Sequence, residues 1–129
     1  MSAPARPPLR RLVKRSQFLR AARGSRAGRP AFGLQAIGTE LDDAGVGFTV
    51  TKKVGNSPER SRIKRRLRAV AAACAADFHT QFEYVLVGRR EALAAPFSTM
   101  IADLGTLLTK VHANTANGNP PTRQRNAKP

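Results

Sequence analysis

A run of alternating residues, followed at once by a long apolar stripe, constrains the fold of this chain more than any other feature. Val46, Phe48 and Val50 occupy every second position within Val46–Val54, which is the period of a β-strand with one buried face. Apolar residues then recur at spacings of 4, 3, 4 and 4 residues, at Ile63, Leu67, Val70, Cys74 and Phe78. Because this is the period of an α-helix with one buried side, the sequence predicts a helix that runs to about Phe78.

The connection between this strand and this helix is predicted to be short. Gly55 and Asn56 end the strand, since both residue types favour turns. Ser57 has a side chain suited to an N-cap, and Pro58 would occupy the first helical position, where its missing N–H costs nothing. The strand and the helix therefore belong to one structural unit.

The remaining elements indicate an α+β domain. We expect a basic helix over Leu9–Ala22, a strand over Ala31–Ile37, an interior strand over Phe82–Gly88 and a last helix opened by Pro96. The last helix carries apolar residues at helical spacing, namely Phe97, Met100, Ile101, Leu104, Leu107, Leu108 and Val111. Such a stripe also fits a partner-binding or membrane face, but a domain this small needs the area for its core. The expected architecture is a two-layer α–β sandwich, with helices packed on one side of a small mixed sheet.

The two ends of the chain lack an apolar face to bury. We expect residues 1–8 to be disordered, residues 9–112 to form the domain and residues 113–129 to form a disordered basic tail. The start lacks the apolar core of a secretory signal, although an Arg-rich, acid-free start also fits an organellar transit peptide. No run of about 18 apolar residues is present, and a single cysteine excludes a disulfide framework within the chain. A cytoplasmic location is the expectation that fits these features.

Positive charge is concentrated in two blocks. The chain has 23 Lys and Arg against 8 Asp and Glu, a formal net charge of +15. Nine basic and no acidic residues fall within residues 1–30, and eight basic residues fall within residues 52–68. A binding face concentrates charge in this way, and so basic a chain repels itself unless a polyanion is nearby. Nucleic acid is therefore the first candidate partner, and an anionic membrane the second.

Within the second block, cations surround the apolar stripe of the predicted helix. At about 100° per residue, Arg66 flanks one side of that stripe. The other cations flank the opposite side or point away from the stripe: Arg60, Arg62, Lys64, Arg65 and Arg68. The first three turns of the helix are thus predicted to face a polyanion.

Side chains for catalysis are scarce. His79 and His112 have no sequence pattern that joins them. The pair Asp42-Asp43 has the character of a solvated turn, and Cys74 lies on the apolar stripe as a packed thiol. No phosphate-binding glycine loop, dinucleotide fingerprint or nucleophile elbow is present. We therefore predict no catalytic residue and no metal site in the polypeptide.

Aromatic side chains for base stacking are also few, with six Phe, one Tyr and no Trp. Most of the phenylalanines fit apolar stripes, so an extended stacking platform is not expected. Phe18 and Phe48 each stand beside basic residues, although core packing is the alternative interpretation for both.

The run from Gly47 to Arg68 closely resembles the signature of the bacterial ribonuclease P protein subunit. In that family a strand ends in Lys-Lys-x-Gly-Asn-Ala, and a helix follows that opens with Arg-Asn-Arg-x-Lys-Arg. This chain has Lys-Lys-Val-Gly-Asn-Ser over residues 52–57 and Arg-Ser-Arg-Ile-Lys-Arg over residues 60–65. Ser61 thus replaces the middle Asn, keeping a short hydrogen-bonding group without the amide. The flanking elements are compatible with the family, so the resemblance spans roughly residues 9–112.

The resemblance implies an RNA-based endonuclease. In this family a large RNA holds the Mg²⁺ ions and removes the 5′ leader of precursor transfer RNA, and the small protein binds that RNA and the leader. The implied partners are the catalytic ribonuclease P RNA, in a 1:1 complex, and precursor tRNA. No membrane, no protein partner and no metal bound stably by the protein are implied. The family fold contains a left-handed β–α–β crossover, formed here by the helix after Val54-Gly55, whereas right-handed crossovers are the general default.

The same resemblance implies which residues bind RNA. By their positions in the signature, the expected contacts to the catalytic RNA are Lys52, Lys53, Arg60, Arg62, Lys64, Arg65 and Arg68. Phe18 and Phe48 are the candidate floor residues of a leader cleft between sheet and helix. Near Ala21, Ala22 and Gln35 the family often has aromatic residues, and this chain does not. A leader would therefore be held mainly by charge, with Phe18 as the stacking group.

Two other kinds of nucleic-acid-binding protein are alternatives. A ribosomal protein of similar two-layer fold would also carry a basic helix and a basic tail. A helix–turn–helix DNA-binding protein is disfavoured, because a strand and not a short helix precedes the basic helix.

Overall fold

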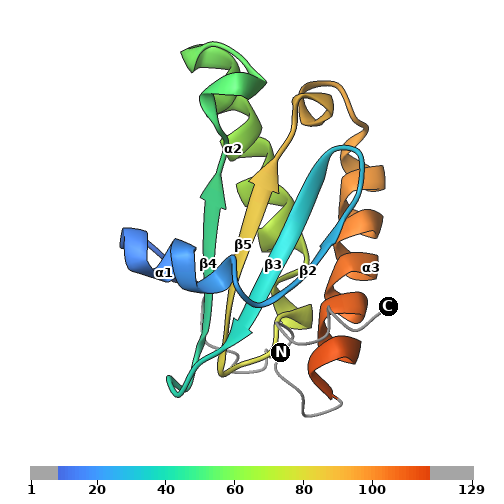
Figure 1. The fold of residues 1–129 in the computed structure, drawn as a ribbon. Coiled ribbons are helices and arrows are strands. Elements are labelled where there is room, and N and C mark those ends of the chain that lie inside the picture. Colours follow the sequence, from blue (N-terminus) through green and yellow to red (C-terminus); the bar gives the residue numbers. More distant parts are fainter. Residues whose placement is uncertain (1–8, 117–129) are drawn as a thin grey trace, which may run out of the picture.

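A mixed β-sheet of five strands is the framework of the domain (Figure 1). The computed structural model describes the backbone of residues 9–116 and the side chains of residues 9–113. In chain order the elements are β1 (Arg10–Arg11), α1 (Arg15–Ala21), β2 (Ser25–Gly28), β3 (Phe32–Gly38), β4 (Ala44–Thr49), the 3₁₀ turn η1 (Lys52–Val54), α2 (Ser57–Ala73), the 3₁₀ turn η2 (Ala75–Asp77), β5 (Phe82–Gly88), the 3₁₀ turn η3 (Arg90–Leu93) and α3 (Phe97–Ala116).

The strands are ordered β1-β4-β5-β3-β2 across the sheet. β4 and β5 are parallel neighbours, with Ala44 opposite Phe82 and Thr49 opposite Val87. Parallel neighbours need a crossover connection, and α2 supplies it. β1 runs parallel to β4, whereas β3 runs antiparallel to β5 and β2, so the sheet is mixed as expected. The β–α–β unit that the resemblance implied is therefore present, and its left hand stays a prediction.

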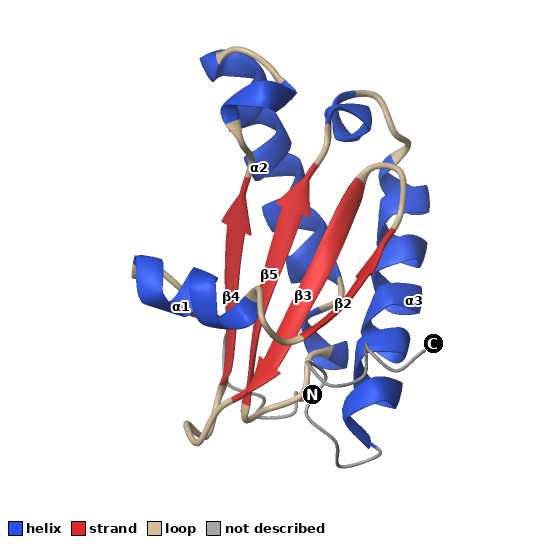
Figure 2. Ribbon diagram, viewed as in Figure 1, coloured by secondary structure: helices blue, strands red, loops and turns tan. Residues whose placement is uncertain are grey.

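The three α-helices of the described residues divide between the two faces of the sheet (Figures 1 and 2). α2 and α3 cover one face and enclose the main core, whose largest fully buried side chains include Phe32, Leu34, Ile63, Leu67, Phe78, Tyr84, Leu86, Met100, Leu104 and Leu107. α1 lies on the other face, where Leu12, Ala21 and Val85 form a smaller core. The expectation that helices pack on one side only is thus correct for α2 and α3 and wrong for α1. β5 has apolar side chains on both faces of the sheet. Val85 and Val87 point to the second face, where α1 shields them from solvent.

The longer elements agree with the sequence patterns. β5 occupies the predicted range, and β3 is displaced by one residue from Ala31–Ile37. The apolar stripe of α3 lies in the core at five positions, Ile101 is partly buried, and Phe97 is 41% exposed. The core interpretation of that stripe is therefore confirmed except at Phe97. α3 continues to Ala116, past the expected domain end at residue 112, and the rest of the two expected disordered ends lies outside the described residues.

The prediction of one helix over Leu9–Ala22 is wrong. Arg10 and Arg11 instead pair with β4 as a short strand, and the Leu12 N–H donates to the Val46 carbonyl at 3.0 Å. α1 begins only at Arg15. Pairing with a distant strand therefore overrides the local helical pattern. β2 was not predicted either, because Gly24 before it and Gly28 at its end have the character of helix breakers. β2 pairs along β3.

The strand and the helix of the signature both end earlier than predicted. β4 stops at Thr49, opposite Val87, because its partner β5 ends one residue later, and Val54 closes the turn η1 by donating to the Thr51 carbonyl at 3.1 Å. α2 ends at Ala73, after which η2 turns the chain towards β5. Cys74 and Phe78 remain buried in the main core, so the stripe is correct as packing although the helix is shorter.

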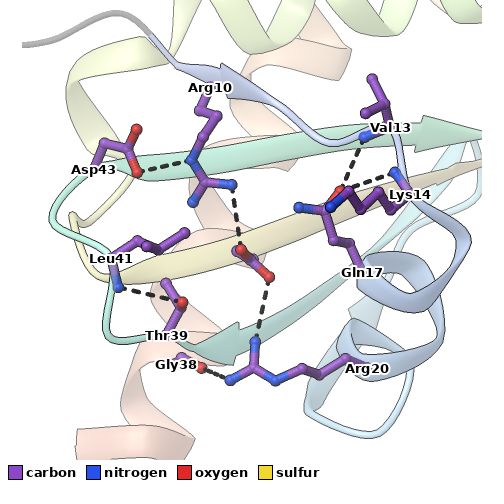
Figure 3. Close-up of polar contacts among 10 residues, drawn as sticks. Arg10, Val13, Lys14, Gln17, Arg20, Gly38, Thr39, Leu41 and Asp43 are labelled. Carbon is purple, nitrogen blue, oxygen red and sulfur yellow. Dashed lines mark hydrogen bonds and ion pairs between the residues drawn. The ribbon is translucent and has the colours of Figure 1, made fainter.

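One buried carboxylate attaches the first two elements to the sheet (Figure 3). Glu83 of β5 is 4% exposed. Arg10 of β1 donates to its Oε2 at 3.3 Å, and Arg20 of α1 donates to its Oε1 at 3.2 Å. Arg10 also pairs with Asp43 at 2.9 Å, and Arg20 donates to the Gly38 carbonyl. Glu83 therefore joins β1 and α1 to the face that α1 covers.

Replacing Glu83 with Gln should destabilise the domain. A carboxamide cannot accept from both guanidinium groups as a carboxylate does, so we expect a loss of roughly 1.5–3 kcal/mol, the range for hydrogen bonds to a charged group. Urea denaturation of the full chain measures this loss, with Glu91→Gln, at an exposed position of η3, as the matched control. Equal denaturation midpoints for the two variants would contradict this role of Glu83.

Candidate nucleic-acid interface

The start of α2 is fixed by a reciprocal cap and an ion pair. Asn56 Oδ1 accepts from the Glu59 N–H at 2.9 Å, and Glu59 Oε1 accepts from the Asn56 N–H at 2.9 Å. The N-cap is therefore Asn56 and not the predicted Ser57, which is the first helical residue. Glu59 also pairs with Arg90 at 3.0 Å, and Arg90 donates to the Val54 carbonyl. Two hydrogen bonds lower the pKa of Glu59. The one from Arg90 has the larger effect and the one from the Asn56 N–H the smaller.

This arrangement joins the turn before α2 to the end of β5. Gly55 lies so close to the ion pair that a Cβ at this position would be 2.5 Å from Glu59 Oε1 and 2.9 Å from Arg90 Nη1. The absence of a side chain at Gly55 thus lets the backbone of the signature lie close to the Glu59–Arg90 ion pair. Its φ of 170° is ordinary extended backbone.

The seven cations expected to bind RNA lie on η1 and the first turns of α2. Lys52 and Lys53 are exposed on η1. On α2 the exposed cations are Arg62, Arg65 and Arg68, and the half-buried ones are Arg60 and Lys64. Arg60 Nε donates to the Gly55 carbonyl at 3.1 Å, which holds this side chain against the cap. The sequence pattern thus identified a helix surface that is cationic away from the core.

Arg66 differs from the other cations of the block. Its Nη1 donates to the Leu93 carbonyl at 3.4 Å, and its Nη2 donates to the Ala95 carbonyl and to Met100 Sδ. These contacts attach α2 to the connection between η3 and α3. The position of Arg66 on the opposite side of the stripe separated it from the proposed contacts, but only the structure shows which groups it binds.

A hollow of about 480 Å³ lies between α1 and the face of the sheet that α1 partly covers. The residues that line it are Val13, Arg15, Phe18, Leu19, Ala22, Gln35, Phe48, Thr49, Val85 and Val87. We refer to it as the sheet hollow. Its position between helix and sheet is that of the cleft implied by the resemblance. Phe18 and Phe48, the two candidate floor residues, both line it.

The seat of Phe18 depends on a glycine in β4. A Cβ on Gly47 would be 2.7 Å from Phe18 Cζ and 3.0 Å from Leu12 Cβ, so only a residue without a side chain lets the ring lie on the strand. Phe18 is half-buried beside the smaller core. Phe18 therefore packs against the smaller core and also lines the sheet hollow.

Phe48 has contacts on both sides of β4. Its ring packs against the main core and lies under Arg68, whose guanidinium carbon is 5.6 Å from the ring centroid. It also lines the edge of the sheet hollow. Phe48 can be reached at this edge because β1 pairs with β4 only as far as Val46.

A second hollow continues the first across the sheet. It has a volume of about 350 Å³ and shares Gln35 and Val87 with the sheet hollow. Its other lining residues include Arg26 and Arg89 with two glycines of β2 and β3, and Arg89 donates to the Arg29 carbonyl at 2.8 Å. The open face of the sheet is thus a track with cations along it.

Ala22 and Gln35, where the family often has aromatic residues, both line the sheet hollow. Ala21 is fully buried and does not. Phe18 is therefore the aromatic side chain that α1 contributes to this surface.

The structure brings the two histidines together, although no sequence pattern joins them. The rings of His79 and His112 stack with centroids 3.4 Å apart, and the Tyr84 hydroxyl lies 2.7 Å from His112 Nε2. Burial, together with the neighbouring His79, lowers the pKa of His112 to about 4. Because the stack is remote in sequence, no local motif could have found it.

The other reactive side chains considered in the sequence, Asp43 and Cys74, take part in ion pairing and core packing. Asp43 pairs with Arg10, and Cys74 is buried, which raises the pKa of its thiol. In the part of the chain that the structure describes, no three His, Cys, Asp or Glu side chains are grouped so as to hold a metal ion. None of the helices in that part is both long and apolar enough to span a lipid bilayer.

The family model described as Ribonuclease P matches residues 7–112. The chain belongs to the ribonuclease P protein family. The ribonuclease P protein component of Paramagnetospirillum magneticum is 46% identical over 112 residues, which cover 81% of this chain and 84% of that relative. The component of Ruegeria pomeroyi is 43% identical over 107 residues, covering 79% and 86%. The solved ribonuclease P protein from Thermotoga maritima has a TM-score of 0.68 at 24% identity, covering 78% of this chain and 96% of that one, and shows the shared fold.

Membership confirms the resemblance found in the run from Gly47 to Arg68. It also confirms the expected role as a protein subunit of ribonuclease P, an RNA-processing enzyme, and the expected α–β sandwich. The ribosomal and helix–turn–helix alternatives are disfavoured accordingly. The signature cations lie on η1 and α2, whereas the sheet hollow is lined by α1 with its flanking residues and by β3, β4 and β5.

Replacing Gly47 with Ala should displace Phe18 from its seat on β4. The added methyl group overlaps the ring, so we expect a loss of about 1–3 kcal/mol of stability, as for other overpacked sites. Urea denaturation measures the loss. The control is Gly105→Ala in α3, where an added Cβ has no heavy atom within 4 Å, and there we expect a gain of up to about 1 kcal/mol. A Gly47→Ala chain as stable as the native one would contradict the packing described here.

Proposed function

We propose that this chain binds the catalytic ribonuclease P RNA through η1 and the outer surface of α2, one protein per RNA, and binds the 5′ leader of precursor tRNA in the sheet hollow. The leader is then removed at the metal ions that the RNA holds. The observation that carries the proposal is the pairing of an exposed cationic helix surface, built on the signature residues, with a partly apolar hollow to which the signature contributes Phe48 and Thr49.

Phosphate recognition supports the first half of the proposal. Arg62 and Arg65 point away from the core and are exposed, and Lys52 and Lys53 extend the cationic surface beyond the N-terminus of the helix. Lys and Arg side chains on such a surface replace the counterions of phosphates, which gives affinity without reading sequence.

The shape of the open sheet face supports the second half. The sheet hollow and its continuation form a track, lined by Arg15 at one end and by Arg26 and Arg89 at the other. A single strand presents phosphates along its length and flat bases between them, so cations with an aromatic ring suit it. Phe18 supplies the ring, and the sheet contributes apolar residues (Phe48, Val85 and Val87) together with Gln35 and Thr49.

In this proposal the Mg²⁺ ions belong to the RNA. The ion prefers oxygen ligands in octahedral geometry, and no group of three or more His, Cys, Asp or Glu side chains placed to hold a metal ion is found among the described residues. We therefore assign Mg²⁺ to the RNA and derive no step through the polypeptide. A cytoplasmic site of action suits the single buried thiol of Cys74.

The first test compares Arg62→Ala with Lys110→Ala, a single-charge control on α3. Each lost phosphate contact should reduce the slope of log affinity against log salt by up to about one unit. Binding of the full chain to cognate ribonuclease P RNA, measured across a range of salt concentrations, checks it. We expect a smaller slope for Arg62→Ala and an unchanged slope for Lys110→Ala; a native slope for Arg62→Ala would remove this part of α2 from the interface.

The second test replaces Phe18 with Leu. Loss of one stacked base should weaken holoenzyme binding of a precursor tRNA with a long leader roughly 5- to 100-fold, the range for one base–aromatic contact. A precursor with a one-nucleotide leader should bind as before. The control is Phe97→Leu, an exposed phenylalanine at the start of α3. Equal loss for both precursors would place Phe18 outside the leader site.

A further inference from the structure

A third hollow lies on the other face of the sheet, between α2 and the edge where β1 ends. It has a volume of about 420 Å³, within the range of roughly 300–1,000 Å³ typical of small-ligand sites. β1 covers the edge of β4 only as far as Val46 before the chain leaves for the opposite face. The space beyond that point, beside Phe48, is bounded by α2. We call it the edge hollow.

The walls of the edge hollow are apolar because α2 contributes small side chains there. Arg68, Ala71, Ala72 and Ala75 line it, which is the i, i+3, i+4, i+7 spacing of one helical stripe continued into η2. Alanine side chains are too short to reach the strand. Phe48 and the alanine methyl groups therefore enclose a space whose walls are largely apolar.

The rim of the edge hollow is cationic. Three arginines line it, from β1 and α2, and no carboxylate is among the described residues that do so. Arg10 is engaged by Glu83 and Asp43, whereas Arg11 and Arg68 are exposed. The Arg68 guanidinium, 5.6 Å from the Phe48 ring centroid, brings a positive charge and an aromatic surface to the same place.

This combination selects a particular ligand chemistry. An apolar space beside an aromatic ring accepts a flat base, and guanidinium groups at the rim accept the phosphate attached to it. An apolar peptide would satisfy the walls and leave the rim without a counter-charge. The edge hollow also lies on α2, the helix that carries the signature cations, and not on the face with the leader track.

We infer that the edge hollow binds one unpaired nucleotide of the catalytic RNA. Its base lies against Phe48 and the alanines, and its phosphate contacts Arg68 and Arg11. This inference rests on the proposed function, because it names a specific nucleotide site within the RNA contact of α2. It assigns to the alanine half of α2 a role in RNA binding that its composition alone does not suggest.

The test fills the edge hollow without changing charge. Ala72 is exposed, so Ala72→Leu adds bulk to the hollow with little cost to the fold, and Ala73→Leu makes the same change at an exposed neighbour that does not line it. Affinity of the full chain for cognate ribonuclease P RNA is measured across salt concentrations, and each free variant is also examined by thermal denaturation and sedimentation. Chemical probing of the RNA, with and without each variant, locates any unpaired nucleotide that the protein protects.

We expect Ala72→Leu to weaken RNA binding roughly 5- to 100-fold with an unchanged salt slope, because a stacked base is lost and the phosphate-binding residues are kept. Ala73→Leu should bind as the native chain does, and one unpaired nucleotide of the catalytic RNA should lose protection only with Ala72→Leu. Phe48→Leu, which retains an apolar side chain, should expose the same nucleotide.

Native affinity and protection for a folded Ala72→Leu chain would overturn the inference. So would loss of protection confined to the precursor leader, or a change only in sedimentation, which would make the edge hollow a contact between copies. The proposed function fails separately, through a native salt slope for Arg62→Ala, so the two failures can be told apart.

Discussion

The buried carboxylate of Glu83 is the interaction on which the arrangement of this protein depends. Two arginines reach it from elements that precede most of the sheet in the chain, one from β1 and one from α1. Burying a charge is costly unless it is paired, and a lone partner would leave part of the carboxylate unsatisfied. The pairing therefore favours one placement of the N-terminal segment over the many that its few apolar residues would allow.

The two hollows that we propose as ligand sites are bounded by the elements placed in this way. α1, held through Arg20, forms one side of the sheet hollow, and β1, held through Arg10, bounds the edge hollow. The cations of α2 divide in a similar way. Arg66 attaches the helix to the connection before α3, Arg60 supports the cap, and the others remain at the surface. A basic block thus supplies structural contacts and exposed charge from neighbouring positions.

Sequence patterns were sufficient where local periodicity and tertiary packing agree. The interior strand β5, the helix α3 and the apolar stripe of α2 all have long runs whose period matches their burial. The patterns failed where distant pairing decides the structure. Arg10 and Arg11 form a strand because they pair with the edge of β4. β2 likewise forms by pairing with β3.

The same distinction between local pattern and distant contact holds for the residues of the candidate site. The signature gave the exposed cations, since their positions follow from helical geometry. It could not separate the roles of the two phenylalanines, because those depend on Gly47 beneath Phe18 and on the early end of β1 beside Phe48. The His79–His112 stack likewise needs the whole fold to bring α3 beside the loop before β5.

Phe48 lies at the boundary of the two hollows that we propose as ligand sites. It lines the sheet hollow on one side of β4 and the edge hollow on the other. Ligands bound in both places would share this residue, so any shift of Phe48 on binding one would alter the free energy of binding the other. Thermodynamic reciprocity requires that coupling to be equal in both directions. Under the two proposals made above, a change at Phe48 would therefore affect the binding of the catalytic RNA and of the leader together.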